Sequence, residues 1–189
     1  KHCNIIYQGA GTETYIDVKD VQKCKVNNIE WAGRVVYLGV DLSESNDNTS
    51  VAMVGVDDND DIIPEVVAFI PEGRIEEKNA FEKLDYKEFI RAEKAIACGD
   101  KVIDYAVDED YILEIEKRYG VQVQAVGYDR YNALSTAQKL ERAGYNTIEI
   151  RQHSSVLHPP TKRLKEKILA GEFQYTENKL LEINFQNAR

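Results

Sequence analysis

The chain has 189 residues, a formal net charge of −9 and 43% hydrophobic residues, which is the composition of one folded domain of ordinary size. It contains no apolar run long enough for a transmembrane helix, and residues 1–30 lack the pattern of a signal peptide. We therefore expect no membrane partner. The negative charge argues against a protein whose whole surface binds nucleic acid.

Charge is spread unevenly along the chain. From Asp41 to Glu65 there are eight acidic residues and no basic ones, whereas Lys139 to Lys167 holds seven basic residues and three acidic ones. An acidic pole beside a basic stretch is an arrangement that can hold metal ions and a phosphate backbone together. Two solvated surfaces of opposite sign explain the same pattern, and charge alone favours that simpler explanation.

The cysteines and histidines do not predict a metal centre. Cys3, Cys24 and Cys98 are odd in number and far apart, so we expect no disulfide framework and a reducing cytoplasm. His153 and His158 have no cysteine nearby and are predicted to be surface residues.

The first half of the chain predicts a three-stranded antiparallel meander. Val35–Asp41 is an apolar, β-branched run that ends in an acid, which is typical of a buried strand. Polar, turn-forming stretches separate it from two more apolar runs, over residues 50–56 and 62–70. Short turns between consecutive strands favour antiparallel pairing.

The second half alternates helices with strands, so the whole chain is predicted to be an α/β fold with a mixed sheet and helices on both faces. The helix over residues 161–170 is expected to begin just after Pro159-Pro160. The predicted helices cover residues 81–95, 107–119, 132–143, 161–170 and 178–187, and the predicted strands cover residues 96–102, 121–129 and 146–151.

Two aspartates are candidates for chemistry because each ends a predicted strand. Asp41 ends the first strand and Asp129 ends the strand over residues 121–129. The element order resembles that of ribonuclease H-like sheets, in which these two strands lie side by side and would bring both carboxylates to one edge. Carboxylates suit Mg²⁺ and Mn²⁺, and a pair of such ions can activate water and stabilise the leaving oxygen in phosphodiester cleavage.

Each aspartate also has an ordinary explanation, because Asp is common in turns and at helix N-caps. Their joint placement favours the metal interpretation. Asp47, in the loop after Asp41, is a third candidate ligand, and an Asx-turn explains it equally well. Residues 57–61 lack the spacing of an EF-hand loop, so they are predicted to form a solvated turn.

Three stretches together resemble the nuclease domain of the phage terminase large subunit. They are YLGVDLSESNDNTS around Asp41, VGYDRYNA around Asp129, and LHPPTKRLKEKILAG in the basic stretch. The opening Lys1-His2-Cys3-Asn4 also resembles the segment that joins the ATPase and nuclease domains in that family. The motifs occur in the family's order over nearly the whole chain, which makes the set more specific than any single motif.

The resemblance implies a ribonuclease H-like fold and a metal-dependent endonuclease that cuts concatemeric double-stranded DNA during genome packaging. Asp41 and Asp129 would be catalytic and would bind two ions of Mg²⁺ or Mn²⁺, with Asp47 as a further metal ligand. The residues that would support the second acid or contact DNA are Arg130, Asn132, Lys162 and Arg163.

The resemblance also implies where the basic stretch meets DNA. A helix that begins after Pro159-Pro160 would point its N-terminal amides, and Lys162, at phosphate. The implied partners are double-stranded DNA, a small terminase subunit and the portal ring, and the implied location is the cytoplasm of the bacterial host.

By the same resemblance, residues 1–34 would be a connecting arm from an ATPase domain, and residues 35–189 would be a nuclease domain that is incomplete at its C-terminal end. The chain starts at Lys1 rather than Met, and it stops at Arg189, before the helix that holds the family's third acid. Both ends are therefore expected to be cut. The chain has no G-x-x-x-x-G-K-[ST] loop, so we do not expect it to translocate DNA by itself.

Two other functions stay open. A truncated fragment without catalytic activity would only bind DNA or packaging partners. An ATP-binding domain of the actin or sugar-kinase type has a similar sheet that also starts with an acid, but that fold needs a second such domain and Gly-rich phosphate turns, which the sequence does not contain.

Overall fold

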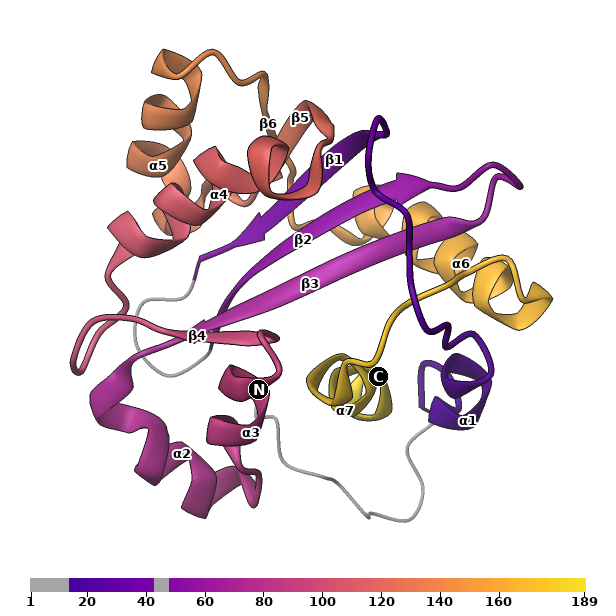
Figure 1. Cartoon of the computed structure of the whole chain (residues 1–189), viewed down its shortest axis with the longest axis horizontal. Coiled ribbons are helices and arrows are strands. Elements are labelled where there is room, and N and C mark those ends of the chain that lie inside the picture. Colours follow the sequence, from indigo (N-terminus) through magenta and orange to yellow (C-terminus); the bar gives the residue numbers. More distant parts are fainter. Residues whose placement is uncertain (1–13, 43–47) are drawn as a thin grey trace.

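A six-stranded mixed sheet forms the centre of the domain, and helices pack against both of its faces (Figure 1). The structure is a computed structural model that describes residues 14–42 and 48–189, without the side chains of residues 130–132. The strand order is β4-β3-β2-β1-β5-β6. β2 is antiparallel to both of its neighbours and the other pairs are parallel, so the predicted mixed α/β sheet is confirmed.

The predicted meander is confirmed as well. β1 covers Val35–Asp41, β2 covers Thr49–Val56 and β3 covers Ile62–Ile70. Exposed and buried residues alternate along β1, because successive side chains of a strand point to opposite faces. Asp41 therefore lies on the exposed face of β1, opposite the face that packs in the core.

The second half supplies two more parallel strands beside β1. β5 (Gln122–Tyr128) pairs with β1, and β6 (Thr147–Glu149) pairs with β5. α4 (Tyr105–Tyr119) precedes β5, and α5 (Arg130–Arg142) connects β5 to β6. These crossovers place the carboxyl ends of β1, β5 and β6 at the same edge of the sheet.

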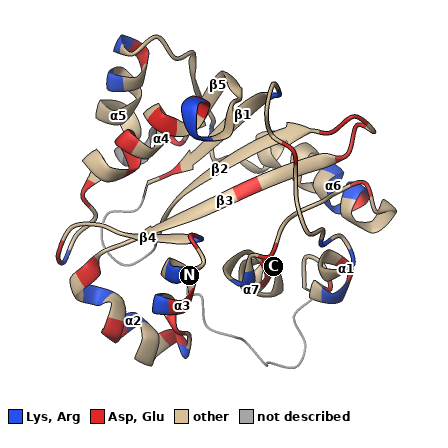
Figure 2. Cartoon of the chain, viewed as in Figure 1, with Lys and Arg blue, Asp and Glu red and all other residues tan. Residues whose placement is uncertain are grey.

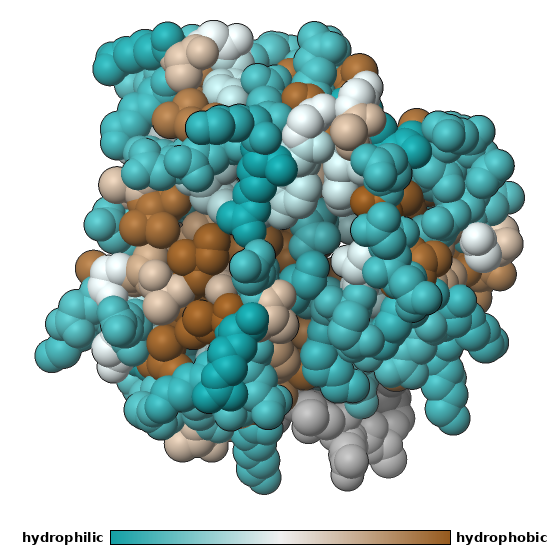
Figure 3. Space-filling view, viewed as in Figure 1, coloured by the Kyte–Doolittle hydropathy of each residue, from teal (hydrophilic) through white to brown (hydrophobic). Residues whose placement is uncertain are grey.

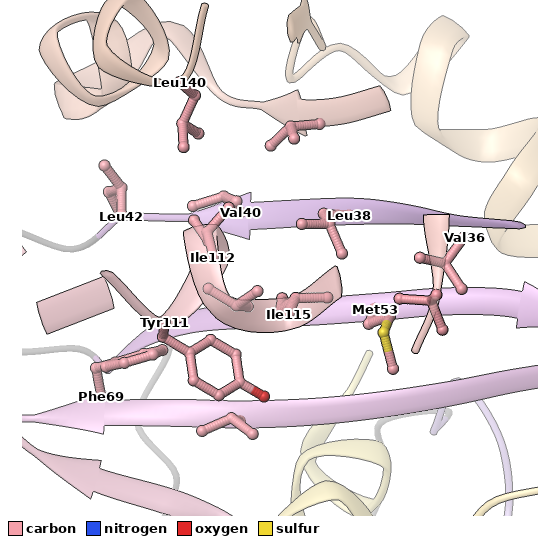
Figure 4. Packing of buried hydrophobic residues seen from close by; sticks show 14 of the residues in the cluster. Val36, Leu38, Val40, Leu42, Met53, Phe69, Tyr111, Ile112, Ile115 and Leu140 are labelled. Carbon is pink, nitrogen blue, oxygen red and sulfur yellow. The ribbon is translucent and has the colours of Figure 1, made fainter. Parts of the chain in front are cut away.

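The main core lies between α4 and the sheet (Figure 4). Ile112 and Ile115 of α4 pack with Val36, Leu38 and Val40 on the inward face of β1. Burying an aliphatic side chain of this size contributes about 2 kcal/mol. This packing holds β1 and its neighbours in one register and so determines where the strand ends lie.

The region after β3 differs from the single helix predicted over residues 81–95. A short 3-10 turn at Glu72–Arg74 leads into α2 (Ile75–Glu82), and a separate helix, α3, covers Tyr86–Arg91. Lys83 takes a left-handed conformation with φ of 58°, and Asp85 caps α3 by accepting a hydrogen bond from the Lys87 amide. Apolar residues keep a helical spacing across the break between α2 and α3, so the sequence pattern does not reveal this break.

β4 is shorter than predicted and covers only Ala95–Ala97. Gly99 ends the extended segment with φ of 65°, and a Cβ there would come 2.2 Å from the Val102 carbonyl oxygen. The turn therefore depends on glycine at this position.

α6 covers Ser154–Ala170, so the prediction that this helix begins after Pro159-Pro160 is wrong. His153 caps the helix, because its ring nitrogen accepts a hydrogen bond from the Ser155 amide at 3.2 Å. This upstream cap starts the helix. The prolines lie inside it, where each removes one helical hydrogen-bond donor.

On the other face of the sheet, α1 (Val18–Gln22) and α7 (Lys179–Asn187) pack against each other. Glu182 of α7 is buried and lies 2.8 Å from Lys25 Nζ, and it accepts hydrogen bonds from Gln22 and Tyr175. These contacts hold the segment before β1 against α7.

The surface in view is largely hydrophilic, with apolar groups gathered near the end of the sheet where β4 lies (Figure 3). No helix among the described residues is long and apolar enough to span a membrane. Cys24 and Cys98 are buried free thiols, while Cys3 lies outside the described residues.

Candidate functional site

The carboxyl ends of β1 and β5 lie side by side. The strand register pairs Gly39 with Gly127 and Val40 with Tyr128, so Asp41 and Asp129 follow at the next level of two parallel strands. Neighbouring strands are about 4.8 Å apart. Two carboxylates at that separation can reach a common divalent ion, which takes oxygen ligands at about 2 Å. The parallel placement predicted for these two strands is confirmed.

The two acids differ in their surroundings. Asp41 is exposed, whereas Asp129 is half-buried and directly precedes α5. The positive end of a helix dipole stabilises a nearby carboxylate. Two carboxylates this close repel each other, and a divalent cation between them would offset that repulsion.

The sheet face beside Asp41 is open. Tyr37, on the same face of β1, has 56% of its surface exposed, and a Cβ placed on Gly39 would meet no atom within 4 Å. At the neighbouring Gly127 a Cβ would come 2.5 Å from Ile150 Cδ1, so this position is filled. A large ligand can therefore approach Asp41 along β1 without meeting a β1 side chain at Gly39.

The structure does not bring all the predicted site residues together. Asp47 lies outside the described residues, and so do the side chains of Arg130 and Asn132, which belong to the first turn of α5. Lys162 and Arg163 are exposed on α6. Because α6 begins at Ser154, these two residues lie in the helix interior, and the prediction that Lys162 marks a helix N-terminus is wrong.

The basic and acidic stretches lie on separate elements. Figure 2 shows acidic residues at the tip of the β2–β3 hairpin and basic residues on α6. Within residues 14–42 and 48–189, no group of three or more His, Cys, Asp or Glu residues is placed to hold a metal ion. Any ion at Asp41 and Asp129 would need further oxygen donors besides these two carboxylates.

The family of the chain follows from its sequence as a whole. The sequence profile of the family described as "Terminase large subunit, endonuclease domain" matches residues 1–189. The chain belongs to this family. It is therefore a terminase large subunit nuclease domain of the bacteriophage type, as its motifs around Asp41 and Asp129 indicate. No curated protein sequence matches it.

Solved structures show the fold of this terminase domain. The large terminase of bacteriophage HK97 superimposes with a TM-score of 0.80 at 20% identity, over 90% of this chain and 35% of that one. The large terminase nuclease of thermophilic phage G20c gives a TM-score of 0.51 at 12% identity, over 79% of this chain and 62% of that one. A second G20c structure, with bound zinc, gives 0.51 at 13% identity, over 82% and 71%. The predicted ribonuclease H-like fold is confirmed.

One further acid of the terminase domain is buried away from the strand ends. Asp108, in the first turn of α4, is fully buried, and neither carboxylate oxygen has a hydrogen-bond partner among the described residues. Burial raises the pKa of Asp108 to about 7, and the Glu109 and Asp104 carboxylates add to the rise. A raised pKa means that the folded state binds the proton more tightly than the unfolded state, so ionisation destabilises the fold.

We expect Asp108→Asn to change the pH dependence of stability. The parent loses unfolding free energy as the pH rises from the ordinary Asp value of 3.8 through about 7, and the variant does not. The stability of the variant relative to the parent should therefore improve by about 4 kcal/mol between pH 4 and pH 8. Urea unfolding at both pH values measures this, with the exposed neighbour Asp110→Asn as the control. An equal difference at both pH values would contradict it.

Proposed function

We propose that this domain is a metal-dependent endonuclease that cuts concatemeric double-stranded DNA during phage genome packaging. The observation that carries the proposal is the placement of Asp41 and Asp129 at neighbouring strand ends of a terminase nuclease domain. The chain spans 35% of the HK97 large terminase, so the activity of a whole terminase is part of the proposal.

The residues present fit divalent ions of the hard type. Mg²⁺ and Mn²⁺ prefer oxygen ligands, and the two aspartates offer carboxylate oxygens at one edge of the sheet. In the proposal Asp41 and Asp129 hold two such ions, and Asp47 is a further ligand. The G20c nuclease structure that contains bound zinc supports a divalent-ion site in this fold.

The chain's own residues would position the substrate. Bound ions would stabilise charge on the scissile phosphate and activate the attacking water. Asp41 and Asp129 would orient those ions, and Arg130 and Asn132 would support the second acid or contact DNA. Lys162 and Arg163 would neutralise backbone phosphates along α6.

The wider setting is also part of the proposal. The partners would be a small terminase subunit and the portal ring, in the cytoplasm of the bacterial host. Residues 1–34 would be the arm from an ATPase domain, and residues 35–189 the nuclease domain. The described part of that arm packs on the domain, since Val21 and Trp31 are buried.

A plasmid-nicking assay tests the proposal. Supercoiled plasmid incubated with the chain and Mn²⁺ should be converted to nicked and linear forms, and a chelator should stop the conversion. Cleavage that continues in chelator would contradict a metal-dependent mechanism. DNA binding without cleavage at any Mn²⁺ or Mg²⁺ concentration would instead support the non-catalytic alternative.

We expect the double variant Lys162→Ala/Arg163→Ala to bind duplex DNA more weakly. Each phosphate contact contributes about 0.9 to the slope of log affinity against log salt, so the slope should fall by about 2. Fluorescence anisotropy with a labelled duplex in chelator measures binding without cleavage. Lys101→Ala/Lys117→Ala removes the same charge from exposed sites on and beside α4 and should leave the slope unchanged. Equal slopes for both variants would contradict a DNA contact on α6.

A further inference from the structure

Asn48 lies at the same sheet edge as the two aspartates. It directly precedes β2, in which Ser50 pairs with Asp41 on one side and with Ala68 on the other. Residues paired across strands point to the same face of the sheet, so Asp41, Ser50 and Ala68 share one face. Ala68 belongs to the core cluster that contains Tyr86, and Asn48 is hydrogen-bonded to Tyr86. Asn48 is therefore held on the face of the sheet that carries Asp41.

A buried chain of polar groups fixes the orientation of the Asn48 amide. Lys78 Nζ lies 3.0 Å from Glu82 Oε1, and the Tyr86 hydroxyl donates to Glu82 Oε2 at 2.5 Å. All three of these side chains are buried. Because a carboxylate only accepts, Tyr86 gives its single hydroxyl proton to Glu82. The Tyr86 oxygen then accepts from Asn48 Nδ2 at 3.0 Å, so Asn48 Oδ1 is the amide atom that does not contact Tyr86.

Asn48 Oδ1 is a buried acceptor without a donor in the part of the chain that the structure describes, residues 14–42 and 48–189. An unsatisfied buried acceptor costs about 1–3 kcal/mol, and such atoms are usually explained by a water or an ion. Amide oxygens are among the ligands that hard divalent ions accept.

We propose that Asn48 Oδ1 is a third protein oxygen donor to the divalent ion at Asp41 and Asp129, and that Tyr86 is the positioning residue that orients it. The inference rests on the proposed metal site. As a neutral donor, Asn48 adds a ligand beside Asp41, Asp129 and the proposed ligand Asp47 without adding negative charge, so it brings no carboxylate repulsion of its own. Tyr86 would act on the ion through Asn48, since its hydroxyl accepts from the Asn48 amide and donates to Glu82.

Calorimetric titration of the full 189-residue chain with Mn²⁺ tests this without relying on cleavage. Asn48→Ala should weaken Mn²⁺ binding by at least about tenfold, and Tyr86→Phe by about tenfold, in line with the loss seen when groups that orient metal ligands are removed. Tyr86→Phe keeps the ring and its edge contact with Phe89 at 5.6 Å. The matched control is Tyr175→Phe, which removes the hydroxyl of another buried Tyr–Glu pair and should leave Mn²⁺ affinity unchanged.

The outcomes separate this inference from the metal site itself. Circular dichroism checks each fold, and Asn48→Ser replaces Asn48→Ala if the latter is unfolded. Parent-like Mn²⁺ affinity in the Asn48 variant overturns the third ligand, and equal losses in Tyr86→Phe and Tyr175→Phe overturn the positioning role. Asp41→Asn provides the reference: if it also binds Mn²⁺ like the parent, the proposed metal site is wrong rather than only its third ligand.

Discussion

Asp41→Asn and Asp129→Asn should each lower the rate of Mn²⁺-dependent plasmid nicking by at least about 100-fold. Removing groups that merely orient a metal ligand costs about 10- to 100-fold in activity, so removing a charged ligand should cost at least as much. Asparagine keeps the size of the side chain and one oxygen but removes the negative charge that attracts the ions. The rate is measured from the loss of supercoiled plasmid at saturating Mn²⁺.

The stability of these two variants provides an independent control. Asparagine is close to aspartate in size and keeps one side-chain oxygen, so the unfolding free energy of each variant, measured in chelator, shows whether the fold survives the substitution. Asp110→Asn, an exposed acid on α4, should nick plasmid at the parent rate. Parent-like nicking by either the Asp41 or the Asp129 variant would remove the basis for the proposed mechanism.

Glu182→Gln should lower the unfolding free energy of the domain by about 3 kcal/mol, the usual cost of breaking a buried ion pair. The carboxylate is 2% exposed and contacts Lys25 and Gln22 from the segment before β1 and Tyr175 from the segment before α7. The substitution removes the buried carboxylate of the cluster and leaves Lys25 paired with the exposed carboxylate of Glu177. Urea unfolding at pH 7 measures the loss.

The same variant predicts a defined pH response. Burial opposes ionisation of Glu182, but hydrogen bonds from Lys25 and its neighbours outweigh it and lower the pKa from 4.5 to about 2. A lowered folded-state pKa means that the stabilisation is present above pH 4.5 and is lost as the pH falls through about 2. The difference in unfolding free energy between the parent and Glu182→Gln should therefore shrink as the pH falls from 4.5 to about 2.

Glu177→Gln is the matched control for Glu182. Glu177 contacts the same Lys25 Nζ at 2.7 Å, but its side chain is 69% exposed. An exposed ion pair contributes about 1 kcal/mol or less, so this variant should stay close to the parent. Equal losses in the two variants would show that burial of Glu182 is not what makes its ion pair strong.

The sequence predicts the strands of this domain better than its helix ends. The alternation along β1 depends on residues that are neighbours in the chain, so Val35–Asp41 is predicted with its observed bounds. Helix boundaries depend on caps. The His153 cap of α6 and the left-handed Lys83 before α3 are single-residue features that apolar spacing does not report.

The residues of the candidate site also differ in how well the sequence predicts them. Asp41 and Asp129 are predictable because each ends a strand, and the order of elements makes the two strands neighbours. Asn48 has no such signal, since it lies in a stretch of polar turn-forming residues. Its partner Tyr86 comes from a helix beyond β3, so only the folded structure brings the two together.

The most direct test of the shared ion site is a crystal of this chain soaked in Mn²⁺, with diffraction data collected at the manganese absorption edge. We expect an anomalous peak within about 2.5 Å of carboxylate oxygens from both Asp41 and Asp129, the range of oxygen–metal contacts. Manganese that binds only elsewhere, or that contacts one of these aspartates while the other points away, would contradict the account.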